Sequence, residues 1–460
     1  MNSSPEQIRT AEGRLASGFV REVEQAISAK NKERVIELAG SLHEADLGEL
    51  IEYLHSNDRI ALVSLLGDAF DFTALTEVDE PIRNRLIEAM PDQEIADGIS
   101  ELESDDAVQI LEDLDQQEQE KILSQLPSVD RVQLRRALEY PEDTAGRLVQ
   151  TDFVAVPPFW SVGQVIDHLR ASEDLPERFY AIYIVDPGFR LLGSIPLDRI
   201  LTTPRSTKVS QIVEEARHLV RVTDDQEEVA RLFERYNLVS VAVADDSDRL
   251  VGIISIDDIV DVIQEEVEED MLAMAGVGDE EISDSVFEIA KLRIGWLVVN
   301  VFTALLAASV ISLFEDTIEL MVALAVLMPI VASVGGNLGT QTMTVSVRAI
   351  ATQDLGRRNL LRVLRRETLV GGVNGLAVGL LVGIIASAWF QDHNIGLVIG
   401  AAVFVNGVCA GLFGLLIPYT LERLRVDPAI ASSVFVTTVT DVVGFFSFLG
   451  LAAWWFQLPM

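Results

Sequence analysis

The sequence predicts a multidomain protein with an α-helical, superhelical N-terminal domain, an α/β domain pair, a long acidic connecting helix and a five-helix α transmembrane domain. Three observations predict this fold. Five long, nearly charge-free stretches follow Arg293, a strand-and-helix pattern is duplicated within residues 160–262, and short amphipathic helical patterns fill residues 5–139. We expect the domains to span residues 1–139, 140–202, 203–262, 263–285 and 286–460.

Charge is divided unevenly along the chain. The 460 residues include 35 Lys and Arg and 72 Asp and Glu, for a formal net charge of −37, yet the mean hydropathy is +0.28. Residues 284–460 hold ten basic and eleven acidic side chains, so the first 283 residues carry a net charge of −36. Such an acidic body excludes nucleic acid as its partner, because phosphate binding needs positive faces. The single cysteine, Cys409, excludes disulfides, and the N-terminal MNSSPEQIRT has no apolar run, so we expect no cleavable signal peptide.

The N-terminal residues 5–139 carry a loose helical repeat. ADLGELIEYLHSNDRIALVSLL resembles QEIADGISELESDDAVQILEDL in its apolar spacing, and EQEKILSQLPSVDRVQLRRAL is a partial third copy. Repeated amphipathic helices predict an array that buries a continuous core between neighbours. Such an array serves as a structural or interaction surface.

The next segment is a duplicated α/β unit. RLLGSIPLDRIL at Arg190–Leu201 recurs as RLVGIISIDDIV at Arg249–Val260, which aligns Gly193 with Gly252. Each copy follows an alternating apolar strand, AIYIVD or VSVAVAD, and each strand follows a helical stretch. The repeat therefore predicts two similar α/β halves that pack together.

An acidic segment, IVDVIQEEVEEDMLAMAGVGDEEISDS, joins this repeat to the first apolar stretch. Glu265, Glu266, Glu268, Glu269 and Asp270 crowd onto its predicted helix. A charge run is usually a solvated face, but juxtamembrane segments normally carry Lys and Arg rather than acids. Because clustered carboxylates repel one another unless a divalent cation neutralises them, the segment is a candidate ion sensor.

Five stretches are long and apolar enough to cross a membrane, which takes about 20 residues. They are Ile294–Phe314, Leu320–Val347, Thr368–Gln391, Ile395–Leu421 and Ala429–Met460. Buried core helices are the alternative, which five in succession disfavour. Basic residues flank alternate ends of the stretches, and the connection from Arg348 to Arg366 contains six Arg, including these two. Since basic loops stay inside, we expect a multi-pass protein of the cell (inner) membrane with its N-terminal domains cytoplasmic and its C-terminus outside.

One acid, Asp441, lies deep in the last span. An intramembrane carboxylate is a functional candidate by default. Ser433 and Thr437 lie eight and four residues before it, so the three side chains share one helix face that suits a water-filled cation path. The alternatives are a protonated Asp bonded to a neighbouring helix, and hydroxyls that only pack helices.

The second span contains PIVASVGGNLGTQT, a poor composition for a plain lipid-facing helix. Its glycines fit close helix packing or a pore lining equally well. Asn337 is harder to explain by packing, and we take it as pore-lining.

These motifs together resemble the MgtE magnesium channel/transporter family over essentially the full length. They are YPEDTAGRLV at Tyr140–Val149, the α/β pair as cystathionine-β-synthase-type (CBS) domains, the acidic segment, GGNLGTQ, VDPAIAS and TTVTDVVG. The resemblance implies a homodimer in the lipid bilayer, with a pore on its two-fold axis, that is selective for Mg²⁺ and closes when cytosolic Mg²⁺ is high. It implies no enzymatic activity.

The resemblance also implies roles for individual residues. Asp441 matches the pore ion-binding carboxylate, and Asp427 a site at the cytoplasmic mouth. The acidic segment matches a plug helix whose gating ligands would be Glu266, Glu269 and Asp270. The remaining regulatory positions are matched by Asp105, Asp258 and Asp261.

Three departures bear on these roles. The family can carry Asn and Ala where Ser433 and Thr437 stand, and Asp where this chain has Gln109. CBS pairs often bind adenine nucleotides, which makes ATP a candidate ligand, but no residue pattern in this chain supports it.

The chemistry of Mg²⁺ fits the function that the resemblance implies. Mg²⁺ loses its water reluctantly and is usually held by one or two carboxylates through water. An inside-negative potential supplies about 2.3 kcal/mol per charge per 100 mV, and the chain has no GxxxxGK[ST] phosphate loop. Two alternatives remain: a proton-coupled secondary divalent-cation transporter in which Asp441 titrates, and a membrane-anchored CBS signalling protein without transport.

Overall fold

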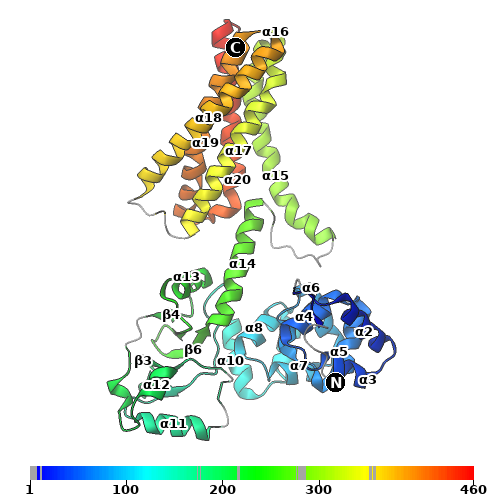
Figure 1. The fold of residues 1–460 in the computed structure, drawn as a ribbon, viewed down its shortest axis with the longest axis vertical. Helices are drawn as coiled ribbons and strands as arrows, with labels where there is room; N and C mark the ends of the chain where they lie inside the picture. The colour runs from blue at the N-terminus through cyan, green and yellow to red at the C-terminus, as the bar shows by residue number, and fades with distance from the viewer. Residues whose placement is uncertain are drawn as a thin grey trace. The chain divides into compact units, whose positions relative to one another are not determined.

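The structure is a computed structural model of the chain, and it divides into two compact units, Met1–Glu266 and Val267–Met460 (Figure 1). The residues that it describes are 8–10, 13–172, 175–176, 178–214, 218–275, 277, 286–351, 355 and 359–459. The end of the predicted connecting helix, at 276 and 278–285, lies outside the described residues, as do Arg357 and Arg358 of the basic connection.

The first unit begins with an array of short helices, as the repeat predicts. They are α2 (Ser17–Ser28), α3 (Lys32–Ala39), α4 (Glu44–Tyr53), α5 (Ser56–Leu66), α6 (Glu80–Ala89), α7 (Asp92–Ile99), α8 (Ser104–Glu112), α9 (Gln116–Leu123) and α10 (Ser128–Leu138), with 3₁₀ turns η1 (Gly67–Ala69) and η2 (Phe72–Leu75). One apolar core runs through the array, with Val23, Leu50 and Ile110 fully buried. Polar residues start several helices: Asp115, for example, accepts hydrogen bonds from the backbone N–H groups of Gln117 and Glu118.

The α/β pair follows, with two three-stranded sheets of the same order and register. Its elements are β1 (Ala155–Val156), α11 (Val162–Ala171), β2 (Ala181–Val185), β3 (Leu191–Pro196), α12 (Leu197–Thr202), η3 (Val209–Gln211), β4 (Leu219–Arg221), α13 (Gln226–Tyr236), β5 (Ser240–Ala244) and β6 (Leu250–Ser255). In each sheet the first strand pairs parallel and the third antiparallel with the middle strand. The duplication predicted from sequence is therefore confirmed.

The aligned glycines of the repeat have one structural reason. Gly193 and Gly252 occupy equivalent register positions in the two sheets, opposite Ile184 and Val243. A Cβ on either glycine would collide with a backbone carbonyl, that of Glu214 in the first half or of Gln150 in the second. Each half thus leaves room for a segment that bridges to its last strand.

Helix α14 (Ile256–Ala275) continues from β6 as one 20-residue helix, which confirms the long acidic helix as far as Ala275. The boundary between the two units falls within it, after Glu266. In the second unit, Ala273 is buried in an apolar cluster with Met343 and Val436.

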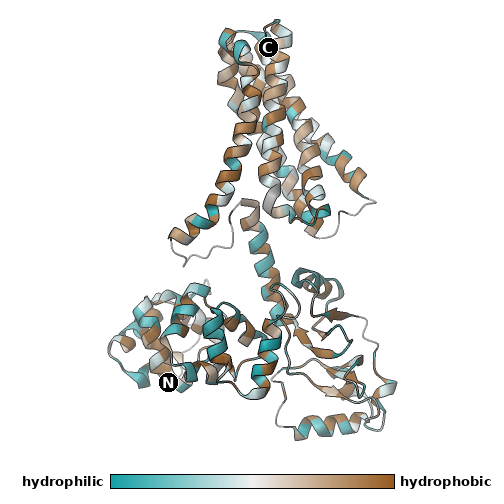
Figure 2. Cartoon of the chain, turned by 180° about the vertical axis from the view of Figure 1, so that it is seen from behind, coloured by the Kyte–Doolittle hydropathy of each residue, from teal (hydrophilic) through white to brown (hydrophobic). Residues whose placement is uncertain are grey.

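The second unit is a helical bundle. It contains α15 (Val286–Ser312), the short α16 (Glu315–Leu320), α17 (Ala323–Ala351), α18 (Leu360–Phe390), α19 (His393–Arg423) and α20 (Pro428–Phe456). All but α16 are long and apolar enough to cross a membrane, so the five predicted spans are confirmed as helices. Figure 2 shows the contrast between these largely apolar helices and the first unit, in which hydrophilic and hydrophobic residues alternate along the elements.

Helices α18 and α19 approach each other closely. A Cβ added to Gly375 would lie 3.1 Å from the Cα of Gly407, and one added to Gly379 would lie 2.6 Å from the carbonyl oxygen of Gly400. Small residues allow such backbone contact between membrane helices. The glycines that follow this seam on α18 are Gly371, Gly375, Gly379 and Gly383.

Candidate functional site

The intramembrane acid Asp441 is the fourteenth of the 29 residues of α20 and is half-buried. Ser433 and Thr437 lie two turns and one turn before it in the same unbroken helix, and both are also half-buried. Thr437 donates its hydroxyl hydrogen to the carbonyl of Ser433 at 2.9 Å, which leaves its oxygen lone pairs as acceptors. The face therefore offers oxygen atoms at successive turns, and such atoms suit a hydrated cation.

Helix α17 packs against this part of α20 through its glycines. A Cβ on Gly339 would lie 2.6 Å from Cγ1 of Val436 and 3.3 Å from Cγ2 of Thr440. Gly335 is equally confined, by the side chain of Asn406 on α19. Helix packing thus accounts for Gly335 and Gly339.

The other face of α17 is polar and exposed. Ser333, Asn337, Thr340 and Thr344 follow one another at spacings of four, three and four residues, so they share one side of the helix. Exposed polar side chains are poorly placed against lipid tails. This face therefore fits contact with water or with a second chain better than contact with lipid.

A buried amide joins three helices of the bundle. Asn406 on α19 is 1% exposed and donates its Nδ2 hydrogen to the carbonyl of Val331 on α17 at 3.1 Å. Gly335 on α17 and Gly444 on α20 leave the space that the amide fills. Among the described residues, its Oδ1 has no hydrogen-bond partner. Asn406 is not among the residues predicted from the sequence, although an amide inside an apolar span is a signal that the sequence contains.

Asp427 stands at the start of α20, as its N-cap. Its Oδ1 accepts a hydrogen bond from the backbone N–H of Ala429 at 2.7 Å, and Pro428 occupies the first helical position. A helix cap accounts for an aspartate here without a metal, so an ion-binding role for Asp427 stays a prediction.

The first unit contains a second acidic site, where α8 meets the start of α14. The side-chain Nε2 of Gln150 lies 2.8 Å from Glu103 Oε2, 3.2 Å from Asp105 Oδ2 and 3.0 Å from Asp258 Oδ2. The structure thus brings the predicted residues Asp105 and Asp258 together, from positions far apart in the sequence. The amide of Gln150 offers two N–H hydrogens to three carboxylates. The carboxylate oxygens could accept more hydrogen bonds than these two hydrogens supply.

Burial controls the protonation of this acidic site. Burial, followed by repulsion from Asp258, raises the pKa of Asp106 to about 7 and raises that of Asp105 well above its usual value. Burial likewise raises the pKa of Asp258 to about 6. Among the described residues, Oδ1 of the 7% exposed Asp105 has no hydrogen-bond partner. The site therefore lacks positive charge, which a cation would supply.

Asp261, the third predicted residue, follows Asp258 on the next turn of α14. Burial raises its pKa, and repulsion from Asp257 adds to this. Asp261 in turn repels Glu77, whose pKa is raised chiefly by burial. The acidic site therefore extends along α14 towards a glutamate that the sequence analysis did not select.

The three residues of α14 predicted to be gating ligands lie further along the helix. Glu266 Oε1 accepts a hydrogen bond from Gln226 Nε2 at 2.8 Å within the first unit. Glu269 and Asp270 belong to the second unit. Within the described part of the chain, no group of three or more His, Cys, Asp or Glu side chains is arranged to hold a metal ion. The predicted ligand sets are thus only partly assembled by this single chain.

Comparison with known proteins identifies the family. Residues 42–143 match the model of the MgtE intracellular N domain, residues 209–265 that of the CBS domain and residues 328–451 that of the MgtE divalent cation transporter. The chain is 34% identical over 319 residues to the magnesium transporter MgtE of Enterococcus faecalis, which covers 69% of this chain and 70% of that protein. The chain belongs to the MgtE family. It is also 36% identical over 321 residues to the MgtE of Thermus thermophilus, covering 68% and 70%.

A solved MgtE structure supports the same assignment for the soluble unit. It is the cytosolic domain of the Mg²⁺ channel MgtE in complex with ATP, matched at 29% sequence identity with a TM-score of 0.50 over 53% of this chain and 99% of that one. This MgtE family member is thus a membrane protein with soluble N-terminal domains.

Proposed function

We propose that this chain is a Mg²⁺-selective, Mg²⁺-gated channel that mediates voltage-driven uptake of magnesium. The observation that carries the proposal is Asp441, a carboxylate halfway along a membrane-spanning helix, on the face that also presents Ser433 and Thr437. Its relatives named magnesium transporters support the choice of ion. We assign it no enzymatic activity.

The channel would be a homodimer. Two copies of Asp441 about a two-fold axis give a charge of −2 against +2, without a cage that strips the ion of its water. The exposed polar face of α17, with Asn337 at its centre, supports this arrangement because it calls for water or a second chain. Asp427, at the start of α20, would lie at the cytoplasmic mouth.

The membrane potential would drive the ion inward. With the N-terminal domains in the cytoplasm and the C-terminus outside the inner membrane, a potential of about 150 mV contributes roughly 7 kcal/mol to the entry of a divalent ion. The basic ends of α17 and α18 support this orientation, since Arg348, Arg362 and Arg365 all lie on the proposed cytoplasmic side.

Closure would follow Mg²⁺ binding to the acidic sites. The regulatory ligands we propose are Asp105, Asp258 and Asp261 in the first unit, and Glu266, Glu269 and Asp270 on α14. Support comes from the buried, under-compensated carboxylates around Gln150. A ligand shifts the equilibrium between two conformations only by the difference in its affinity for them. Mg²⁺ must therefore bind the closed arrangement of these acids more tightly than the open one.

ATP is a secondary candidate ligand at the CBS pair. The support for it is the ATP complex of the similar cytosolic domain.

The test is ion flux into proteoliposomes that hold the full chain, with internal Mg²⁺ clamped and the voltage set by a potassium gradient. Asp441→Asn should lower Mg²⁺ influx at least tenfold, whereas Asp392→Asn, a matched change at the N-cap of α19, should leave it intact. Unchanged flux and selectivity in Asp441→Asn would remove the pore role. Flux that follows a pH gradient at fixed voltage would favour the proton-coupled carrier instead.

A further inference from the structure

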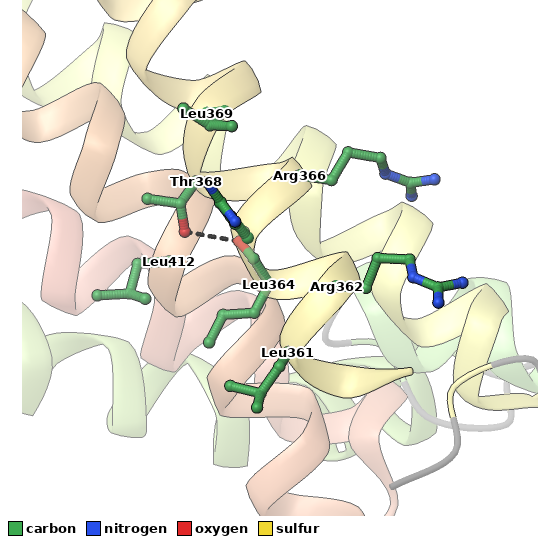
Figure 3. Close-up of a pocket in the computed structure, with 8 residues that line it drawn as sticks. Leu361, Arg362, Leu364, Arg366, Thr368, Leu369 and Leu412 are labelled. Carbon is green, nitrogen blue, oxygen red and sulfur yellow. Dashed lines mark hydrogen bonds between the residues drawn. The ribbon is translucent and has the colours of Figure 1, made fainter. Parts of the chain in front are cut away.

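An apolar groove with a basic rim lies beside the first turns of α18. It has a volume of about 850 Å³, and Leu361, Leu364 and Leu412 form its apolar part, the last of these from α19. Figure 3 shows Leu361, Leu364 and Leu412 together on one side, while Arg362 and Arg366 extend in parallel from the other side of the helix. Arg365 also lines the groove. The groove therefore combines hydrocarbon with guanidinium groups, a composition typical of an amphiphile site.

Two of the three arginines of this groove have no acidic partner among the side chains that the structure describes. Arg366 forms an ion pair of 2.8 Å with the largely buried Glu367. Among the side chains that the structure describes, Arg362 and Arg365 make no ion pair, and both are exposed. Two guanidinium groups thus stand open to an anion, and their planar donors match phosphate geometry.

The position along α18 places these arginines at headgroup level. Trp389, 75% exposed, lies 23 residues after Arg366 near the other end of the helix. That spacing corresponds to about 35 Å at 1.5 Å per residue, slightly more than the ~30 Å hydrocarbon core. Tryptophan and arginine at such a separation mark the two interfaces of one span.

An exposed apolar stripe continues from the arginines into the span. Leu369, Val373, Leu376 and Leu380 are 60–67% exposed. They lie 7, 11, 14 and 18 residues after Arg362, so they follow the same helix face. An acyl chain whose phosphate contacts the arginines would have this stripe directly above it.

We infer that this groove binds one anionic phospholipid of the inner leaflet, with the phosphate held by Arg362 and Arg365 and the apolar part along Leu369, Val373 and Leu376 on the same helix face. Charge complementarity selects an anionic over a zwitterionic headgroup, and the leucines select a lipid over a free phosphate. The inference rests on the proposed orientation, which puts the start of α18 on the cytoplasmic side.

The experiment measures lipid retention by the full chain, independently of transport. Delipidated protein in detergent is titrated with phosphatidylglycerol or phosphatidylcholine, and bound lipid is counted by native mass spectrometry. We expect the Arg362→Gln/Arg365→Gln variant to lose roughly tenfold or more of its phosphatidylglycerol affinity. The matched control is Arg423→Gln/Arg425→Gln, which removes two arginines from the same end of the bundle outside the groove and should retain its affinity.

A second variant tests the groove itself. Leu369→Asn interrupts the apolar stripe while leaving the arginines in place, and it should also weaken phosphatidylglycerol binding. Thermal midpoints of all variants show that they are folded. Equal loss in the Arg423/Arg425 control, unchanged binding in the Arg362/Arg365 variant, or equally tight binding of inorganic phosphate each overturns the inference. Loss of magnesium flux with normal lipid retention would concern the proposed function alone.

Discussion

The side-chain Nε2 of Gln150 donates a hydrogen bond of 3.0 Å to Oδ2 of Asp258, 108 residues later in the chain. The same nitrogen lies within hydrogen-bond distance of Glu103 and Asp105. A neutral amide thus stands at a point where three carboxylates of two domains meet. A cation at the position of this amide would stabilise the three carboxylates strongly, because the attraction between opposite charges is weakly screened in a partly buried site.

Placing a permanent cation at this point gives the first prediction. Gln150→Lys puts an ammonium among Glu103, Asp105 and Asp258, so the full chain in detergent should melt at a higher temperature without Mg²⁺ than the unchanged chain does. Added Mg²⁺ should then raise the melting temperature less, because the charge it would neutralise is already compensated. Thermal unfolding across a Mg²⁺ titration measures both effects.

The control for this variant is Gln93→Lys. Gln93 is exposed on α7 and contacts Asp97, so the same charge change is made within the same compact unit. It should leave the Mg²⁺ response as it was. An unaltered response in Gln150→Lys would show that the acids around Gln150 do not sense Mg²⁺.

The second prediction concerns pH and Glu112. Burial raises the pKa of Glu112 to about 7, despite its 3.1 Å ion pair with Arg147. Between the usual value near 4.5 and about 7, the folded state therefore binds more protons at this group than the unfolded state, and stability falls as pH rises. Glu112→Gln should flatten that part of the curve of melting temperature against pH. A curve of unchanged slope would mean that Arg147 keeps the carboxylate ionised.

Elements that follow a regular sequence pattern could be predicted from the sequence. The five spans follow from length and hydropathy alone, and the repeat that aligns Gly193 with Gly252 predicted two sheets with equivalent strands. The spans depend on local composition and the sheets on local alternation and repetition, and neither needs knowledge of distant contacts. The acidic helix α14 could also be predicted from a local pattern.

Contacts between residues far apart in the sequence could not be predicted. Nothing in the sequence marks Gln150 as the donor to Asp105 and Asp258, since the contact exists only once the helical array meets the CBS pair. Asn406 lay in a span that already satisfied the hydropathy criterion, so its role between α17 and α20 needed the packed bundle. Asp105 and Asp258 were predicted as regulatory ligands from family resemblance rather than from spacing, and their contact through Gln150 was not predicted.

The third prediction compares two threonines on α20. Thr437 is half-buried on the face of Asp441, whereas Thr440 is fully buried and bonded to the carbonyl of Val436. Thr437→Val removes an oxygen from the proposed ion path and should lower Mg²⁺ flux severalfold in proteoliposomes. Thr440→Val makes the same chemical change away from that path and should leave flux per folded channel near normal. Equal effects of the two changes would argue against the proposed pore face.

The fourth prediction is a coupling between Gly335 and Asn406. Gly335→Ala forces a Cβ into the Asn406 amide and should destabilise the bundle, while Asn406→Ala should cost about 1–3 kcal/mol through its lost hydrogen bond and packing. The double variant should be less destabilised than the sum of the two, because the smaller side chain at 406 leaves room for the new methyl. Unfolding of the full chain in detergent measures the cycle. If the two changes in the free energy of unfolding simply add, the helices shift apart to accommodate the methyl group instead.

The fifth prediction concerns closure. Replacing Glu266, Glu269 and Asp270 together with Ala removes three carboxylates from α14, so Mg²⁺ can no longer stabilise the closed arrangement through them. The variant should still conduct at millimolar cytosolic Mg²⁺, where the unchanged channel closes.

The control for closure removes three acids elsewhere. Glu315, Asp316 and Glu319 are exposed on α16, so replacing them with Ala makes the same change in net charge away from α14. That control should close as the unchanged channel does, because its sensing acids are intact. Flux at clamped internal Mg²⁺ separates the two variants. If both close normally, Glu266, Glu269 and Asp270 do not sense the ion.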